Sequence, residues 1–174
     1  MTSLDRKSLV SWMGQSLAIE VQFNSQTCIP QLQAVGYTVT RYKFPADSGR
    51  KVYLARMIAS LFKVEQNILV YLQNVGVFPS SSHRPLLYRL REAWGERRNV
   101  EEFPGHLFAA AEIDDVASLL ILAYEFFWDC FIIGEGGSLA VYISHDEYYD
   151  LIYLDEAGIA DFKWKLETWN SKTA

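Results

Sequence analysis

The chain has 174 residues, of which half are hydrophobic and 14% are aromatic, with a formal net charge of −5. This length and composition predict a single domain over residues 1–174 with a sizeable core, and they exclude a low-complexity chain. The only cysteines, Cys28 and Cys130, are far apart and lack C-x-x-C spacing, which argues against a disulfide scaffold or a zinc site. A polar N-terminal stretch without a signal-peptide pattern favours a reducing cytoplasm.

The first part of the chain predicts helices and strands in alternation. Residues 3–23 are expected to be helical, and Pro30 can open a short helix that Gly36 ends. Residues 37–44 alternate between polar and apolar side chains, as a half-buried strand does. An amphipathic helix over 50–63 and an apolar strand over 67–72 then complete the length of a βαβ unit, which predicts a right-handed crossover.

The next elements are separated by loops. Residues 76–82 predict a loop, and a helix is expected from Ser82 or His83 to about Trp94, with Pro85 in its first turn. Connecting chain follows, with a short strand at Leu107 and Phe108.

The stretch from Glu101 to Asp155 carries the strongest signals. Residues 112–128 are apolar on nearly every side, which indicates a buried helix rather than a membrane span, because Asp115 and Glu125 interrupt it. Apolar runs at 130–133 and 139–143 flank a Gly-Gly turn, which predicts a β-hairpin.

The residues after this hairpin allow two interpretations. Ser144 and Glu147 have the spacing of a capping box, which favours a helix starting at His145. The alternative is a strand through 148–154, where β-favouring residues are abundant. A helix over 157–169 is expected to end the chain. Together these elements predict an α/β domain with a mixed sheet of about four to six strands, a buried central helix and flanking helices.

Charge is distributed unevenly along the chain. Residues 1–98 contain 13 Lys and Arg against 6 Asp and Glu, a net of +7, whereas residues 99–174 contain 3 Lys against 15 Asp and Glu, a net of −12. The two halves can neutralise each other across the fold. Alternatively, the acidic half binds a basic protein partner, or the basic half binds nucleic acid.

Two polar groups are candidate sites. A metal or acid–base cluster could gather from His106, Glu112, His145, Asp146 and Glu147. None of these pairs has the spacing of a helical metal motif. Structural roles are the simpler interpretation: a capping box at 144–147, an acidic first helical turn at 112–115, and a turn that contains His106. The chain lengths between them predict that His106 and the Ser144–Glu147 turn lie more than about 12 Å apart. No catalytic residue, metal ligand or cofactor is assigned.

Basic residues form the second candidate group. Arg50 and Lys51 follow a strand-to-helix turn that has the placement of a phosphate loop, although Asp47 there is better suited to cap the helix. A nucleic-acid contact would use Arg84, Arg91, Arg97 and Arg98, with Glu92 and Glu96 interleaved among them.

Several short motifs together resemble a family of bacterial proteins of uncharacterised activity. They are Val77–Ser80, Gly95–Arg98, Pro104–Phe108 (PGHLF), Trp128–Asp129 (WD) and Ser144–Glu147 (SHDE). The resemblance covers residues ~37 to 150, transfers no catalytic residue and implies a shared role for the PGHLF and SHDE turns. The acidic, aromatic-rich composition is also similar to that of immunity proteins of bacterial toxin systems.

The sequence therefore favours a non-enzymatic interaction or regulatory protein that binds a basic partner through its acidic C-terminal half. The alternatives are a metal- or phosphate-dependent enzyme that uses His106, His145 and nearby carboxylates, and a nucleic-acid-binding protein that uses the arginines of 84–98.

Overall fold

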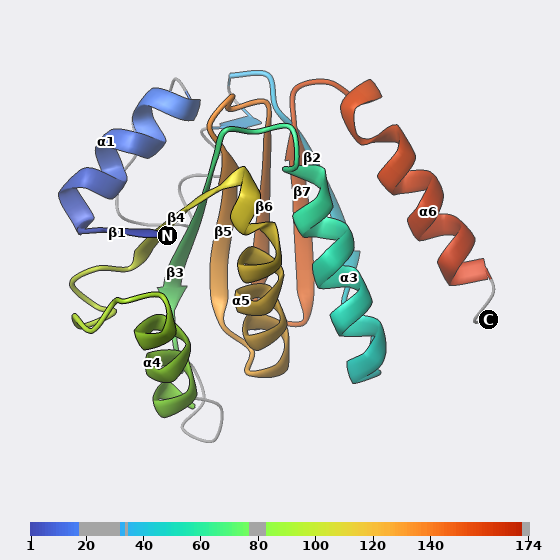
Figure 1. Ribbon diagram of the computed structural model, residues 1–174. Helices are drawn as coiled ribbons and strands as arrows, with labels where there is room; N and C mark the ends of the chain where they lie inside the picture. Colours follow the sequence, from blue (N-terminus) through green and yellow to red (C-terminus); the bar gives the residue numbers. More distant parts are fainter. Residues whose placement is uncertain (18–31, 34, 77–82, 172–174) are drawn as a thin grey trace.

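A sheet of antiparallel strands is the centre of the computed structural model, which describes residues 1–17, 32–33, 35–76 and 83–171 (Figure 1). Within these residues the sheet has seven strands in the order β1-β4-β3-β5-β6-β7-β2. The strands are β1 (Thr2–Leu4), β2 (Thr38–Lys43), β3 (Asn67–Asn74), β4 (Gly105–Ala109), β5 (Asp129–Gly134), β6 (Leu139–Ser144) and β7 (Tyr148–Tyr153).

Helices cover both faces of this sheet. The helices are α1 (Arg6–Leu17), α3 (Ser48–Leu61), α4 (Arg84–Ala93), α5 (Ile113–Glu125) and α6 (Ala160–Ser171), with short 3₁₀ turns η2 (Ala110–Glu112) and η3 (Ala157–Ile159). Helices α3 and α5 lie side by side across one face, flanked by α4 and α6 (Figure 1). Helix α1 packs on the opposite face.

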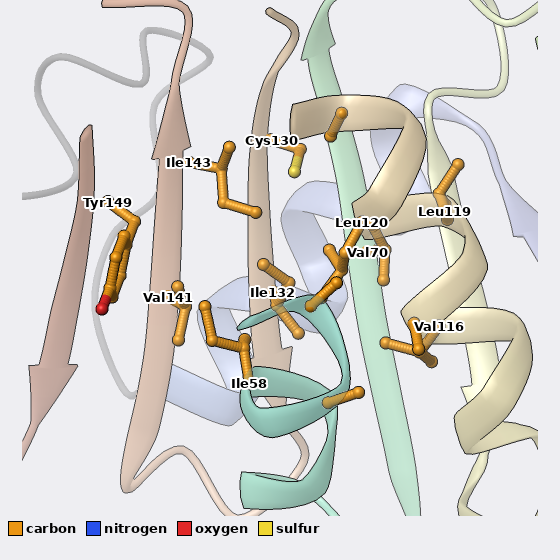
Figure 2. Close-up of a cluster of buried hydrophobic side chains, with 14 of the residues drawn as sticks. Ile58, Val70, Val116, Leu119, Leu120, Cys130, Ile132, Val141, Ile143 and Tyr149 are labelled. Carbon is orange, nitrogen blue, oxygen red and sulfur yellow. The ribbon is translucent and has the colours of Figure 1, made fainter. Parts of the chain in front are cut away.

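The largest core lies between the sheet and helices α3 and α5. Figure 2 shows Ile58 of α3 and Leu120 of α5 directed towards Val70, Ile132 and Val141 of the central strands. All five side chains are completely buried. The nearly all-apolar surface of α5 is therefore explained by its position in the core, as the sequence predicts.

Most predicted elements are confirmed. The hairpin of β5 and β6, the strands β2, β3 and β4, and the helices α3, α4, α5 and α6 lie where the sequence places them to within a few residues. Within the described part of the chain, every helix falls short of the length and apolar character needed to span a bilayer. Cys130 is a buried free thiol, as expected for a core residue, whereas Cys28 lies outside the described residues.

The predicted α/β class is confirmed, and the sheet has seven strands, slightly more than the four to six expected. The expected mixture of parallel and antiparallel strands, with a βαβ unit of adjacent strands, is wrong, because all neighbouring strands pair antiparallel. Strands β2 and β3 run in the same direction, but β5, β6 and β7 lie between them. The strand–helix–strand pattern predicted the elements and their direction but not their distance in the sheet. That distance depends on the later hairpins, which insert between the two strands.

The predicted helix at His145 is also wrong, and the alternative strand reading is confirmed. Residues 144–147 form a tight turn in which the Glu147 amide donates to the Ser144 carbonyl (3.2 Å) and Glu147 takes a φ of 63°. Strand β7 then pairs with β6 and β2 on both edges. Ser-x-x-Glu spacing fits this turn as well as a capping box, and the apolar residues that follow are better buried in a sheet.

The predictions for 3–23, 30–36 and 76–82 can be compared only in part with the structure. The helix expected over 3–23 begins only at Arg6, because Thr2–Leu4 pairs with β4 and Asp5 accepts a hydrogen bond from the Ser8 amide (2.7 Å). Its continuation beyond residue 17 lies outside the described residues. Of the predicted 30–36 helix, residues 32 and 33 are helical and Gly36 lies in a turn with a φ of 96°, whereas residues 30, 31 and 34 lie outside the described residues. Residues 77–82 of the predicted loop also lie outside them.

The β5–β6 turn makes the fold sensitive to one glycine. Gly137 has a φ of +66°, and a Cβ built there would lie 1.7 Å from the Ser16 carbonyl oxygen of α1. We expect Gly137→Ala to lower the free energy of unfolding by more than about 2 kcal/mol, since both the backbone and α1 would have to shift. Urea denaturation measures this.

Gly158→Ala is the matched control for Gly137→Ala. No atom lies within 4 Å of its added Cβ, so its free energy of unfolding should stay within about 0.5 kcal/mol of the wild type. Equal effects of the two substitutions would contradict the close approach of α1 to the hairpin.

Candidate functional site

The five residues of the predicted polar cluster do not form one site. His106 lies in β4 and shares a row with Val70, Ile132 and Val141, whereas His145 lies just beyond β6. Three strand spacings of ~4.8 Å, or roughly 14 Å, separate β4 from β6. The register therefore agrees with the predicted separation of His106 from the Ser144–Glu147 turn.

His106 is tied to a buried arginine. The Arg91 guanidinium is fully buried and donates to His106 Nε2 (3.0 Å), to the Arg98 carbonyl (2.7 Å) and to the Phe103 carbonyl (3.2 Å). Burial, with a smaller contribution from Arg91, lowers the pKa of His106 to about 3. His106 is thus a neutral acceptor that helps Arg91 fasten the 97–105 segment, and this position leaves it unsuited to acid–base chemistry near neutral pH.

Glu112 has a different local role. Its carboxylate pairs with the N-terminal ammonium group of Met1 and accepts a hydrogen bond from the Ala109 amide (2.9 Å). The N-terminal ammonium group lowers the pKa of Glu112. This residue therefore holds the N-terminus at the start of η2.

His145 is oriented by a carboxylate that sequence analysis did not select. Asp129, which is buried, accepts hydrogen bonds from the His145 backbone amide (2.8 Å) and Tyr142 hydroxyl (3.3 Å), and both its oxygens lie 2.9 Å from His145 Nδ1. Nε2 lies 3.5 Å from Asp146. Of the predicted cluster, only His145 and the adjacent residues of its turn come together. The Trp128–Asp129 motif was the one signal for Asp129.

A second missed pair lies two strands away. Arg41 of β2 donates two hydrogen bonds to the fully buried Asp150 of β7, at 2.7 and 2.8 Å, and its guanidinium stacks 3.7 Å from the Tyr148 ring centroid. Hydrogen bonding to Asp150 raises the pKa of Arg41. The two residues are 109 positions apart, so no local pattern pointed to them. No group of three or more potential metal ligands gathers anywhere in the described part of the chain.

Nearly all of the predicted basic contacts are engaged within the protein. Arg84 pairs with Glu101 (2.5 Å), Arg97 with Glu92 (3.4 Å) and Arg98 with Glu96 (2.6 Å), while Arg91 is buried. Lys51 reaches the Tyr124 carbonyl (3.4 Å) and Glu125 (3.7 Å). These cations do not form a phosphate track.

Arg50 is different from the other predicted contacts. Asp47 caps α3 and accepts from the Arg50 amide (2.9 Å), but among the described residues no carboxylate lies within ion-pair distance of the Arg50 guanidinium. The predicted helix-capping role of Asp47 is confirmed.

One end of the sheet is strongly acidic. The register brings together the start of β3, the end of β4, the β5–β6 turn and the end of β7, which form the upper end of the molecule in Figure 1. We call the carboxylates at these positions the acidic end: Glu65, Asp114, Asp115, Glu135, Asp155 and Glu156. All are exposed or half-buried, and within the described part of the chain only Glu156 has an ion-pair partner, 2.7 Å away at Lys163.

The charge asymmetry persists in the folded protein. Among the described residues, side-chain ion pairs join the two halves at Arg41–Asp150, Lys51–Glu125 and Arg84–Glu101. All three lie away from the acidic end, whereas the N-terminal ammonium group of Met1 pairs with Glu112 next to it. Direct pairing between the halves therefore leaves the acidic end largely unneutralised.

Exposed apolar side chains lie at the same end. Val64 is 90% exposed beside Glu65, Leu154 is 51% exposed beside Asp155, and Val35 is 50% exposed just before β2 begins. Large apolar side chains among charged ones are typical of a protein-binding surface.

No family model matches the chain, and no curated protein or solved structure matches it either. The resemblance drawn from the PGHLF, WD and SHDE motifs remains a prediction.

The buried state of His106 predicts a specific pH dependence. Because the folded pKa is lowered to about 3, stability from the neutral ring is fully present above the unfolded pKa of ~6.5 and falls below it, by up to about 1.4 kcal/mol per pH unit. We expect His106→Gln to show a shallower decline in the free energy of unfolding than the wild type between about pH 6.5 and 4.5. Urea denaturation across this range tests the difference.

The exposed His83 supplies the control, so His83→Gln should keep the wild-type slope. Parallel curves for wild type and His106→Gln would show that His106 is not held neutral in the folded protein.

Proposed function

We propose that this chain is a non-enzymatic binding protein that takes a basic surface of a partner protein onto its acidic end. The observation that carries this proposal is the concentration of six carboxylates at one end of the sheet. Among the described residues one of them, Glu156, is paired with a cation, while Glu65, Glu135 and Asp155 accept hydrogen bonds from uncharged groups. Such a field attracts and orients a basic partner before contact. If the resemblance to immunity proteins holds, a toxin is one such partner.

The exposed apolar residues would provide the contact once the partner is oriented. Val64 and Leu154 can bury apolar area in the centre of an interface while the carboxylates form its charged surround. The end of the sheet from β3 to β2 spans four strand spacings, or roughly 19 Å, which is wide enough for a modest protein interface.

A second candidate function rests on Asp129 and His145. A buried carboxylate that orients a half-buried histidine is the arrangement used for general acid–base catalysis and for single metal ligands. Metal analysis of protein purified without a histidine tag tests this alternative, and a stoichiometric metal lost in His145→Gln would favour it. The nucleic-acid alternative has less support, since the arginines of 84–98 are paired or buried.

The leading proposal predicts that binding depends on the acidic end. The triple variant Asp114→Asn, Glu135→Gln and Asp155→Asn removes three charges with little change of shape. We expect it to lower the affinity for a partner captured from source cells by about ten-fold or more, because each lost charge pair across an interface weakens attraction. Affinity capture followed by titration of the purified partner at two salt concentrations measures the effect.

A matched variant removes the same number of charges elsewhere. Glu102, Asp146 and Glu147 are exposed at the opposite end of the sheet, and Glu102→Gln, Asp146→Asn and Glu147→Gln together should leave affinity nearly unchanged. Equal losses of affinity in both variants would show that binding depends on the net charge of the protein and not on the acidic end. Unchanged affinity in the first variant, or no partner at low and moderate salt, would refute the proposal.

A further inference from the structure

A pocket of about 270 Å³ lies between the β2–β7 edge of the sheet and helices α3 and α6. It is separate from the acidic end and from the Asp129–His145 pair. Its walls are formed by the side chains of Tyr42, Phe44, Tyr149, Leu54, Leu166 and Trp169. A space of this size is just below the range of drug-sized sites, so it suits a ligand with one ring.

Stacked aromatic rings give this pocket rigid, planar walls. Tyr42 and Tyr149 are cross-strand partners whose rings stack with 5.3 Å between centroids. Phe44 stacks on the same Tyr149 ring, with 6.1 Å between centroids. The Tyr124 ring packs edge-on against Phe44, with 4.6 Å between the two ring centroids. Rings held on two paired strands lose little freedom on binding, and they favour a planar aromatic ligand.

Positive charge lies at the mouth. Arg50 of α3 lines the pocket, and among the described residues no carboxylate lies within ion-pair distance of its guanidinium. Arg50 is half-buried, with its guanidinium carbon 5.8 Å from the Trp169 ring centroid. The nearby Asp47 carboxylate is occupied by the helix cap. The mouth therefore offers cationic donors to an anion.

One of the residues that line the pocket has a polar group without a partner in the described part of the chain. Tyr149 is 1% exposed, and its hydroxyl oxygen is buried without a hydrogen-bond partner in the described residues. Buried hydroxyl groups are nearly always hydrogen-bonded, so a partner from a ligand or a water molecule is expected here. Burial also raises the pKa of Tyr149, which keeps the hydroxyl protonated and able to donate.

We propose that this pocket binds a small planar aromatic carboxylate. The ring lies against Tyr149 and Phe44, the carboxylate meets Arg50 at the mouth, and a polar group on the opposite side of the ring meets the Tyr149 hydroxyl. Apolar walls alone would accept a neutral ring, whereas the Arg50 guanidinium at the entrance selects an acid.

The probes are 4-hydroxybenzoate, benzoate and 4-hydroxybenzyl alcohol, titrated into the full-length protein and followed by two-dimensional NMR. We expect 4-hydroxybenzoate, with about ten non-hydrogen atoms, to bind with a Kd below ~10 mM and to shift resonances around the pocket. The neutral alcohol should bind at least about ten-fold more weakly. No saturable shifts for the two acids, or shifts confined to another surface, would overturn the proposal.

Two variants test the contacts separately. Arg50→Gln should weaken 4-hydroxybenzoate by about ten-fold, while Arg56→Gln, an exposed arginine further along α3 and outside the pocket, should not. Tyr149→Phe should remove the preference for 4-hydroxybenzoate over benzoate and leave benzoate binding nearly unchanged. Equal affinity in the two arginine variants would overturn the site at the mouth. A preference that survives Tyr149→Phe would overturn the contact with the Tyr149 hydroxyl and indicate that a water molecule satisfies the hydroxyl.

Discussion

The β5–β6 hairpin is the constraint on which the rest of the structure depends. Every residue of both strands is buried, and both strands are paired on each edge. Cys130 and Ile132 point to the core under α3 and α5, while Phe131 and Ile133 point to the core under α1. A hairpin that is apolar on both faces is stable only inside a sheet that is covered on both faces. The flanking strands and the two helical layers meet that requirement.

Buried polar groups fit into this sheet in pairs. Arg91 is satisfied by His106 and two loop carbonyls, Asp150 by Arg41, and Asp129 by His145 and Tyr142. Arg41 and Asp150 are 109 positions apart, whereas the other pairs join neighbouring elements 7 to 16 positions apart. Leaving one partner of such a buried pair unpaired would cost far more than losing a surface contact. The pairs thus help to fix the register of the strands and the path of the loops.

Local sequence patterns predicted most helices and strands, but they could not predict features that depend on contacts between distant segments. The Gly-Gly turn between apolar runs and the all-apolar helix were sufficient for β5, β6 and α5, because those signals are contained in a few neighbouring residues. The SHDE turn was misread since Ser144 and Glu147 fit two local structures, and only pairing with β2 and β6 selects the strand. The acidic end could be anticipated only as an excess of negative charge, because its carboxylates come from segments between residues 65 and 156.

The central claim is that the acidic end is the surface on which a basic partner binds. Hydrogen–deuterium exchange of the protein, free and in complex with a captured partner, tests it most directly. The account predicts slower exchange in the complex at residues 63–65, 135–138 and 154–156, with no change at the 144–147 turn at the opposite end of the sheet. Protection at the 144–147 turn without protection of the 135–138 turn would contradict the claim.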